Sequence, residues 1–336
     1  MRKLTDLVAI AAVFGCVAAG ISATAADAPA TKKKSVDAAK PAAAKQPAAP
    51  EGPKPTMANV PYGPHPKQVI DFYQAKSDTP TPLVFYIHGG GWMGGSKDRV
   101  GAIATYHAEG ISVVSVEYRF IPEATADGVK PPVKGPLHDA ARALQFVRSK
   151  AKEWNIDKTR IGATGGSAGA CSSLWLAFHD DLADAKSEDP IARESTRLSC
   201  AAVIGAQTSL DPKQMKEWMP NSKYGGHAFG FAPDNAKKLT QFDVFLAGRE
   251  TILPLIKEYS PYELVTSDDP PIHLAYGAAP AMGQEQKDPT HSANFGVGLQ
   301  EKCKSVGVEC ELVYPGAPDV RHAMTHQFLI EKLKAK

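Results

Sequence analysis

A serine stands in a run of small residues at positions 165–169, which read GGSAG. A short β-leaning run precedes it, and residues 170–178 form an apolar run of helical character. This G-x-S-x-G pattern is typical of a strand that turns sharply into a helix and presents the serine hydroxyl at the tip of the turn. The helix N-terminus beneath such a turn favours developing negative charge. We therefore expect Ser167 to act as a nucleophile.

A second motif lies about eighty residues upstream, where the apolar run at residues 83–87 is followed by HGGGW at residues 88–92. A motif of this kind supplies backbone N–H groups to a tetrahedral intermediate. Glycine lets the backbone approach the substrate oxygen closely, because it carries no Cβ. We expect an oxyanion hole made by the N–H groups of Gly90, Gly91 and Ala168, with His88 bracing the loop and Trp92 packing under it.

Two such motifs in this order resemble those of the α/β-hydrolase superfamily. The resemblance is strongest to its hormone-sensitive-lipase-like and feruloyl- or acetyl-esterase-like carboxylesterases. It implies the α/β-hydrolase fold, with a mostly parallel central sheet, helices on both faces and an inserted lid. It also implies a serine carboxylesterase that forms an acyl-enzyme on Ser167 and needs no cofactor. The substrates would be acetyl or feruloyl esters of polysaccharide, or small lipid esters.

The serine needs an imidazole to take its proton, and the imidazole needs a carboxylate to fix its tautomer. In this superfamily the histidine comes after the acid and follows the last strand. The last expected strand lies at residues 309–314, and the segment after it leads to His322. We therefore predict His322 as the base, with His326 as the alternative.

The acid is less clearly marked, because Pro280 stands where relatives carry an aspartate shortly after the penultimate strand. If residues 280–287 are a loop extension, Asp288 occupies the place of the acid. Glu285 and a degenerate triad without an acid remain as alternatives. We interpret the nearby His291 as a structural or rim histidine.

The elements that must position these residues alternate between strand and helix, which indicates a mostly parallel sheet covered on both faces. We expect strands at residues 83–87, 111–118, around 161, 200–206, 272–276 and 309–314. Helices are expected at residues 98–109, 137–154, after the GGSAG turn and at 293–305, with a loop at 122–136. Residues 208–269, with several aromatic side chains, are too long for a simple connection and are interpreted as a lid insertion.

The N-terminal part of the chain has a different composition. Residues 1–26 combine a basic start, an apolar run and a small-x-small cleavage pattern, which is typical of a secretory signal peptide. Residues 27–59 are rich in Ala, Pro and Lys and are interpreted as a disordered linker. The catalytic domain would then span residues 60–336. These features predict export to the periplasm or the extracellular space, with no membrane span after cleavage.

Charge and cysteine content exclude several functions. A formal net charge of +2 argues against a nucleic-acid partner. No Cys or His cluster has the spacing of metal ligands, so we expect no metal. Cys303 and Cys310 bracket a turn between a helix and a strand and could form a disulfide.

Two other functions remain open at this stage. A secreted serine peptidase of the same fold is disfavoured, because no propeller-like N-terminal domain is present to select peptides. A non-catalytic binding protein that kept the turn but lost the acid is the other alternative. The expected partner of the esterase is a small-molecule or polysaccharide-borne ester.

Overall fold

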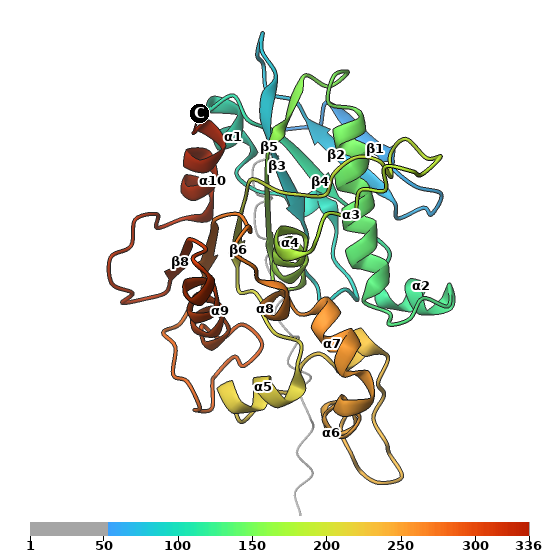
Figure 1. Cartoon of the computed structure of the whole chain (residues 1–336), viewed down its shortest axis with the longest axis vertical. Helices are drawn as coiled ribbons and strands as arrows, with labels where there is room; N and C mark the ends of the chain where they lie inside the picture. Colours follow the sequence, from blue (N-terminus) through green and yellow to red (C-terminus); the bar gives the residue numbers. More distant parts are fainter. Residues whose placement is uncertain (1–52, 336) are drawn as a thin grey trace, which may run out of the picture. The chain divides into compact units, whose positions relative to one another are not determined.

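Eight strands form one sheet in the computed structural model, which describes residues 53–335 (Figure 1). The strands are β1 Met57–Pro61, β2 Val69–Tyr73, β3 Thr81–Ile87, β4 Ser112–Val116, β5 Ile156–Gly166, β6 Cys200–Ile204, β7 Ile272–Ala275 and β8 Cys310–Val313. Their order across the sheet is β1-β2-β4-β3-β5-β6-β7-β8. Only β2 runs antiparallel to its neighbours, β1 and β4. The other neighbouring pairs are parallel, which confirms the mostly parallel sheet.

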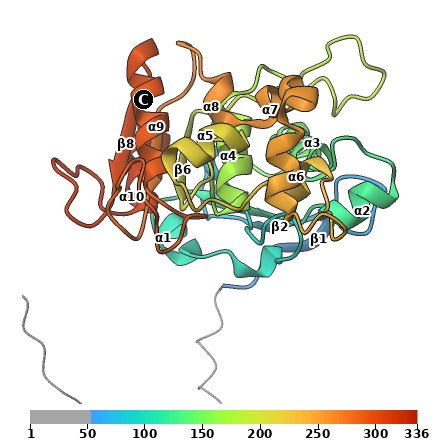
Figure 2. The same ribbon diagram turned by 90° about the horizontal axis from the view of Figure 1, so that it is seen from below.

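Helices cover both faces of this sheet. The helices are η1 Lys97–Arg99, α1 Ile103–Ala108, α2 Ile121–Ala126, α3 Lys134–Ser149, α4 Ala168–Phe178, α5 Pro212–Trp218, η2 Gly226–Phe229, α6 Gln241–Ala247, η3 Arg249–Ile252, α7 Leu253–Tyr259, α8 Pro261–Leu264, α9 Asn294–Val306 and α10 Thr325–Lys334. Successive side chains of a strand point to opposite faces. In β3, Leu83 and Phe85 accordingly join the core under α3 and α4, while Val84 joins the core under α1 and α10. Figure 2 shows α1 and α4 on opposite sides of the sheet.

Two local predictions differ from the structure. The helix expected at residues 98–109 is reduced to η1 and α1, because Val100 is extended and Ala102 has a left-handed backbone. The loop expected at residues 122–136 contains α2 and the start of α3. Pro122 does not prevent α2, since proline is tolerated in the first turn of a helix.

The described residues all belong to one unit, Pro50–Lys336. The predicted signal peptide at residues 1–26 lies outside the described residues, as does most of the predicted linker at residues 27–59. The end of that linker is described, and it belongs to the sheet, because β1 begins at Met57 and pairs with β2. Within residues 53–335, no helix has the length and apolar character needed to cross a membrane.

The insertion predicted at residues 208–269 runs from β6 to β7 and is built from short helices, α5 to α8, together with η2 and η3. It contains no single long crossover helix. Helix α8 packs against α4, so the insertion joins the face of the sheet that carries α4. Cys303 and Cys310 do not form the disulfide that their spacing allows, because both are free thiols in the structure.

Candidate active site

Ser167 stands between β5 and α4, at the carboxyl edge of the parallel strands. Its φ angle is 55°, in the left-handed region, where a residue other than glycine stores roughly 1–3 kcal/mol of backbone strain. A Cβ added at Gly169 would lie 2.1 Å from the Ile87 carbonyl oxygen. The helix therefore begins in direct contact with β3, and only glycine allows this. The Ser167 N–H donates to the Ile204 carbonyl at 3.0 Å, which ties the turn to β6. The predicted strand, sharp turn and helix are confirmed.

A histidine and an aspartate are aligned with the serine hydroxyl. His291 Nε2 lies 2.9 Å from Ser167 Oγ, and His291 Nδ1 lies 2.8 Å from Asp288 Oδ2. In this geometry an imidazole can take the hydroxyl proton while the carboxylate holds its tautomer and orientation. The structure thus brings the predicted Asp288 to Ser167, but it does so through His291.

The carboxylate of Asp288 is fixed by its own loop. Its Oδ1 accepts hydrogen bonds from the backbone N–H groups of Thr290 at 3.1 Å and His291 at 3.2 Å. Burial would raise the pKa of Asp288, but the hydrogen bond and charge of His291 and the two backbone N–H groups hold it below its ordinary value. The side chain is 62% exposed, so water reduces the strength of these interactions. Asp288 is therefore ionised at neutral pH and faces the imidazole.

The loop that carries Asp288 and His291, residues 276–293, connects β7 to α9. Asn294, fully buried at the start of α9, holds the loop backbone at Ala281, where its Oδ1 accepts at 2.7 Å and its Nδ2 donates at 2.9 Å. Gln207 Nε2 donates to the Thr290 carbonyl at 2.6 Å, one residue before His291. Two buried amides therefore hold the loop on either side of the Asp288 carboxylate.

The prediction that His322 reaches Ser167 is wrong. His322 lies between β8 and α10 and is only 7% exposed. Its Nδ1 lies 2.9 Å from a carboxylate oxygen of Glu311, and its Nε2 lies 3.0 Å from one of Glu331. Both ring nitrogens are thus held by carboxylates from β8 and α10, and His322 ties these two elements together.

The alternative base His326 and the alternative acid Glu285 form no hydrogen bond with Ser167, whose hydroxyl contacts His291. His326 is the second residue of α10 and forms part of the wall of a hollow beside Gly166. Glu285 is exposed on the loop between β7 and α9. The carboxylate that contacts His291 from this loop is that of Asp288. The interpretation of His291 as a structural or rim histidine is wrong, since this residue is the partner of Ser167. The sequence held one indication of this role: His291 follows Asp288 by three residues, and two side chains at this spacing can form a hydrogen bond within a single turn of the backbone.

The loop after β3 lies against the serine turn. A Cβ at Gly89 would be 2.5 Å from the Gly166 carbonyl oxygen. Gly90 has a φ of 107°, and a Cβ there would lie 2.1 Å from the Gly94 carbonyl oxygen, so this position requires glycine. Among the described residues, the N–H groups of Gly90 and Gly91 donate to no backbone acceptor. They remain available to a substrate oxygen.

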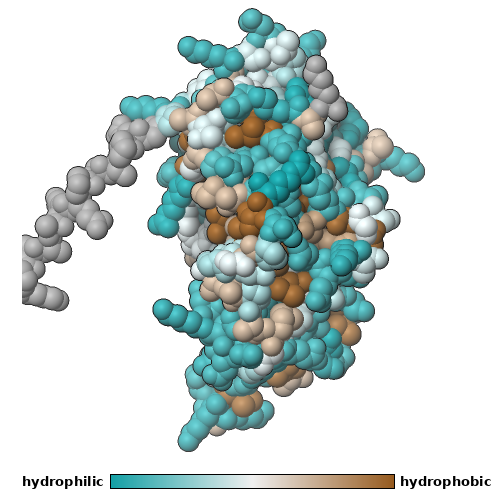
Figure 3. All heavy atoms as spheres, turned by 90° about the vertical axis from the view of Figure 1, so that its left-hand side faces the viewer, coloured by the Kyte–Doolittle hydropathy of each residue, from teal (hydrophilic) through white to brown (hydrophobic). Residues whose placement is uncertain are grey.

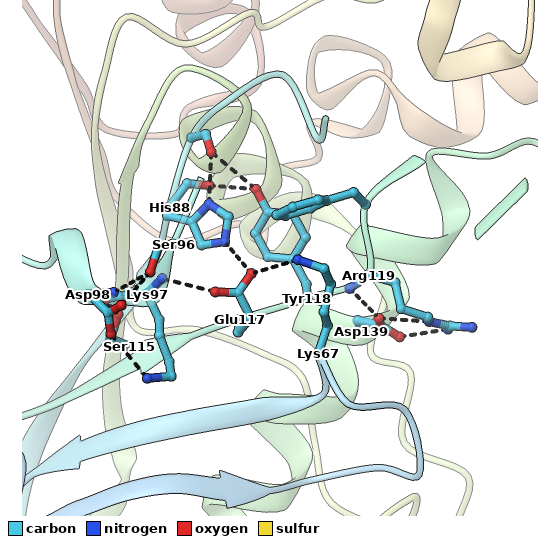
Figure 4. Close-up of polar contacts among 12 residues, drawn as sticks. Lys67, His88, Ser96, Lys97, Asp98, Ser115, Glu117, Tyr118, Arg119 and Asp139 are labelled. Carbon is cyan, nitrogen blue, oxygen red and sulfur yellow. Dashed lines mark hydrogen bonds and ion pairs between the residues drawn. The ribbon is translucent and has the colours of Figure 1, made fainter. Parts of the chain in front are cut away.

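A buried polar network holds this loop from the end of β4, as Figure 4 shows. His88 Nδ1 lies 2.8 Å from the Gly89 carbonyl oxygen, and His88 Nε2 lies 3.2 Å from Glu117 Oε1. The Tyr118 hydroxyl donates to the His88 carbonyl at 2.8 Å. Burial would raise the pKa of Glu117, but its contacts with His88 and with the Lys97 N–H lower it overall. His88 therefore braces the loop, as predicted.

The other expected support, Trp92, is fully buried and donates from Nε1 to Ser172 Oγ of α4 at 3.0 Å. The insertion reaches the same loop, because His227 Nε2 lies 3.0 Å from the Gly91 carbonyl oxygen. Burial lowers the pKa of His227, although the Gly91 carbonyl acts in the opposite direction. A neutral His227 therefore donates to Gly91, and the insertion contacts the oxyanion loop directly.

The chain matches the model of a known protein family. A model of the BD-FAE family matches residues 70–287, which is well over half of the chain. The match ends one residue before Asp288, so it includes Ser167 and the glycine loop but not Asp288 and His291.

Curated proteins with similar sequence are esterases. Carboxylesterase NlhH of Mycobacterium tuberculosis is 39% identical over 98 residues, which cover 29% of this chain and 28% of that protein. Gut esterase 1 of Caenorhabditis elegans is 31% identical over 158 residues, which cover 44% of this chain and 27% of that protein. The match therefore spans less than a third of the length of these relatives.

Solved structures share the fold at low sequence identity. An acetyl ester-xyloside bifunctional hydrolase from Caldicellulosiruptor lactoaceticus superposes with a TM-score of 0.53 at 24% identity, over 73% of this chain and 76% of that one. A truncated carbohydrate esterase from gut microbiota gives a TM-score of 0.60 at 20% identity, over 83% of this chain and 96% of that one. The similarity shows a shared architecture.

Proposed function

Because the chain belongs to the BD-FAE family and has the α/β-hydrolase fold, we propose that it is a serine carboxylesterase. One observation carries the proposal: Ser167 Oγ, His291 and the Asp288 carboxylate form a continuous chain of hydrogen bonds of 2.9 Å and 2.8 Å. A serine hydroxyl is a weak nucleophile until a base accepts its proton. This arrangement supplies the base and the acid that orients it.

The reaction proceeds in two steps, acylation of Ser167 and hydrolysis of the acyl-enzyme. Ser167 Oγ attacks the ester carbonyl carbon while His291 Nε2 takes the hydroxyl proton, and a tetrahedral intermediate forms. The bond to the alcohol oxygen then breaks, and His291 returns the proton to that oxygen. Water next attacks the acyl-enzyme, giving its proton to His291, and the acid is released as Ser167 recovers the proton.

The negative charge that develops on the carbonyl oxygen would be stabilised by the N–H groups of Gly90, Gly91 and Ala168. Two of these lie on the loop braced by His88, and the third lies at the N-terminus of α4, where the helix dipole favours negative charge. Such donors contribute most when they are held in place before the reaction. The contacts of Glu117 and Tyr118 with this loop support that role.

The proposed substrates are carboxylic esters of small alcohols or of polysaccharides. The names of the structural relatives, an acetyl ester-xyloside bifunctional hydrolase and a carbohydrate esterase, support acetyl esters of sugars. Feruloyl esters and small lipid esters remain in the proposed range. The leader-like residues 1–26 support export. The complete Ser167, His291 and Asp288 chain disfavours a non-catalytic protein with a degenerate triad.

The proposal is tested by labelling with a fluorophosphonate probe, which reacts with an activated serine. The purified protein should be labelled at Ser167, and it should release p-nitrophenol from p-nitrophenyl acetate. Ser167→Ala should abolish both signals. Ser173→Ala provides a matched control, since Ser173 is a buried serine of α4 whose hydroxyl bonds within the helix. A folded protein that is not labelled at Ser167 would contradict the proposal.

A further inference from the structure

Trp92, the last residue of the HGGGW motif, has an unusual backbone conformation. Its φ angle is 56°, and a bulky residue in the left-handed region is strained. Gly91 before it is also left-handed, with a φ of 62°, and the Met93 N–H closes the turn on the Gly90 carbonyl at 3.0 Å. This turn carries the N–H groups that would face the substrate oxygen. Strain of this kind persists only when neighbouring groups hold the backbone in place.

Hydrogen bonds from three different elements hold this strained turn. The Ile121 N–H of α2 donates to the Trp92 carbonyl at 2.8 Å, and the Trp92 indole donates to Ser172 of α4 at 3.0 Å. The third bond comes from the insertion, where His227 Nε2 lies 3.0 Å from the Gly91 carbonyl oxygen. The insertion therefore supplies the contact at a residue whose own N–H is expected to bind the oxyanion.

The contact at Gly91 matters because each peptide unit is planar. A carbonyl that is held in place also fixes the N–H on the other side of the same peptide unit. The Met93 N–H holds the Gly90 carbonyl and so fixes the Gly91 N–H. His227 holds the Gly91 carbonyl, which fixes the second peptide unit attached to the Gly91 Cα. Glycine rotates more freely about its backbone bonds than other residues, so Gly91 needs both contacts to keep one conformation.

His227 is itself held firmly by its surroundings. The Val133 N–H donates to the carbonyl of Ala228, the next residue, at 2.9 Å, which ties η2 to the start of α3. The His227 ring lies edge-on to the Tyr224 ring, with 5.1 Å between centroids, and 6.2 Å from the Trp92 ring. The imidazole is therefore fixed in front of the Gly91 carbonyl by the backbone and by aromatic packing.

The position of these rings suggests more than a cover for the sheet. On the face with α10 and β8, apolar side chains form small patches separated by hydrophilic ones (Figure 3), as is normal for a protein surface. Tyr224 and His227 of the insertion instead lie against the loop after β3, with Tyr224 Oη 4.0 Å and His227 Nε2 3.9 Å from a Cβ added at Gly91. Packing alone would be satisfied by any apolar ring at position 227. A ring nitrogen aimed at a backbone carbonyl adds a directed hydrogen bond.

We propose that His227 is a positioning residue of the oxyanion hole, so that the insertion forms part of the catalytic site. The proposal rests on the esterase function proposed above and adds a residue to its machinery. His227 contacts no reacting atom. It acts through Gly91, by keeping the N–H groups of the turn aimed at the oxygen of the tetrahedral intermediate. Donors that are fixed before the reaction stabilise the developing charge without reorganisation, so loss of the contact weakens transition-state binding more than ester binding.

The test compares two replacements of His227. His227→Leu removes the donor, and it should lower kcat for p-nitrophenyl acetate about three- to tenfold, the effect of one hydrogen bond. KM should stay within about twofold, because acylation and deacylation use the same oxyanion hole and slow together. His227→Gln keeps an N–H donor and should recover most of the rate. A trifluoromethyl ketone, which forms a tetrahedral adduct with Ser167, should bind His227→Leu more weakly by the same factor as kcat falls.

Gln241→Met is the matched control. Gln241 Nε2 donates to the Phe231 carbonyl at 2.8 Å, so this variant also removes one side-chain bond to a backbone carbonyl of the insertion, but one that does not involve the oxyanion loop. It should keep kcat within about twofold. An unchanged kcat in folded His227→Leu would overturn the proposal. An equal loss in Gln241→Met would assign the effect to general loosening of the insertion, and an equal loss in His227→Gln would assign it to ring shape; either result also overturns the proposal.

Hydrogen exchange of residues 88–95, measured by mass spectrometry, separates this proposal from the proposed function. The Met93 N–H is protected by its bond to the Gly90 carbonyl. It should exchange faster in His227→Leu than in the unchanged protein or in Gln241→Met. Faster exchange in a protein without esterase activity would contradict only the proposed function. Unchanged exchange in His227→Leu would overturn the positioning role, whether or not the protein is an esterase.

Discussion

Replacing Asp288 by asparagine isolates the contribution of one charge to the reaction. The amide keeps the size of the side chain, and its oxygen can still accept from the N–H groups of Thr290 and His291. Its NH2 group, however, would then face His291 Nδ1 at the position where Oδ2 now lies at 2.8 Å. A donor there favours the tautomer whose proton sits on Nε2. In that tautomer the imidazole donates to Ser167 Oγ and cannot accept its proton.

The magnitude follows from the exposure of the carboxylate. An acid-to-amide change at a buried triad aspartate lowers kcat by about 10⁴. Asp288 is 62% exposed, so water can partly replace the missing acceptor and part of the tautomer penalty is recovered. We therefore expect a loss of about 10²–10³ in kcat, which is about 3–4 kcal/mol, with KM changed much less.

The assay is steady-state hydrolysis of p-nitrophenyl acetate, with thermal unfolding recorded on the same samples. Asp319→Asn is the matched control, because Asp319 is an exposed loop aspartate after β8 and should retain full activity. Asp288→Asn with the turnover of the unchanged protein would refute the reasoning and assign the orienting role to another group.

Three further predictions concern the supports of the site and the core. Glu117→Gln should lower kcat about tenfold with little change in KM, because His88 loses a charge-assisted hydrogen bond; an unchanged kcat would contradict this. Gly169→Ala should lower the Tm by roughly 5–10 °C through its clash with β3, whereas Gly277→Ala, in open space, should not. Burial lowers the pKa of His138 from 6.5 to about 4. The unfolded chain therefore binds this proton first, and unfolding free energy should fall by on the order of 3 kcal/mol between pH 6.5 and 4. His138→Phe should flatten this part of the curve in pH-dependent urea unfolding.

The fold was predictable because its elements are encoded locally. Strands buried on both faces read as continuous apolar runs, as in the segment that became β3, and parallel pairing follows from alternation with helices. The turn at Ser167 was equally visible, since it needs glycine at close backbone contacts. Asp288 could be located by counting back from the expected last helix and strand. All of these inferences depend on residues near one another in the chain.

The partner of Ser167 could not be predicted in this way. His291 and Ser167 are 124 positions apart, and the long loop between β7 and α9 hides where its side chains point. His322 follows the last strand, as the superfamily order suggests, but Glu311 on β8 and Glu331 on α10 hold both of its ring nitrogens. These contacts form only once the sheet and the last helix are packed.

Two errors in the predicted element boundaries also involve contacts between residues far apart in the chain. The helix expected at residues 98–109 is interrupted by the extended Val100 and the left-handed Ala102, next to a segment that the Lys97–Asp71 ion pair of 2.7 Å anchors to β2. The helix propensities of the individual residues carry no information about such a tertiary contact. The end of the linker was assigned by composition, but strand pairing with β2 recruits Met57 into the sheet.

The assignment of the base is tested most directly by comparing two histidine variants, His291→Gln and His322→Gln, for kcat/KM with p-nitrophenyl acetate. The geometry predicts that His291→Gln loses about 10³–10⁶ in rate, while His322→Gln, once shown to be folded, keeps the activity of the unchanged protein within about tenfold. Full activity of His291→Gln together with an inactive but folded His322→Gln would contradict the account.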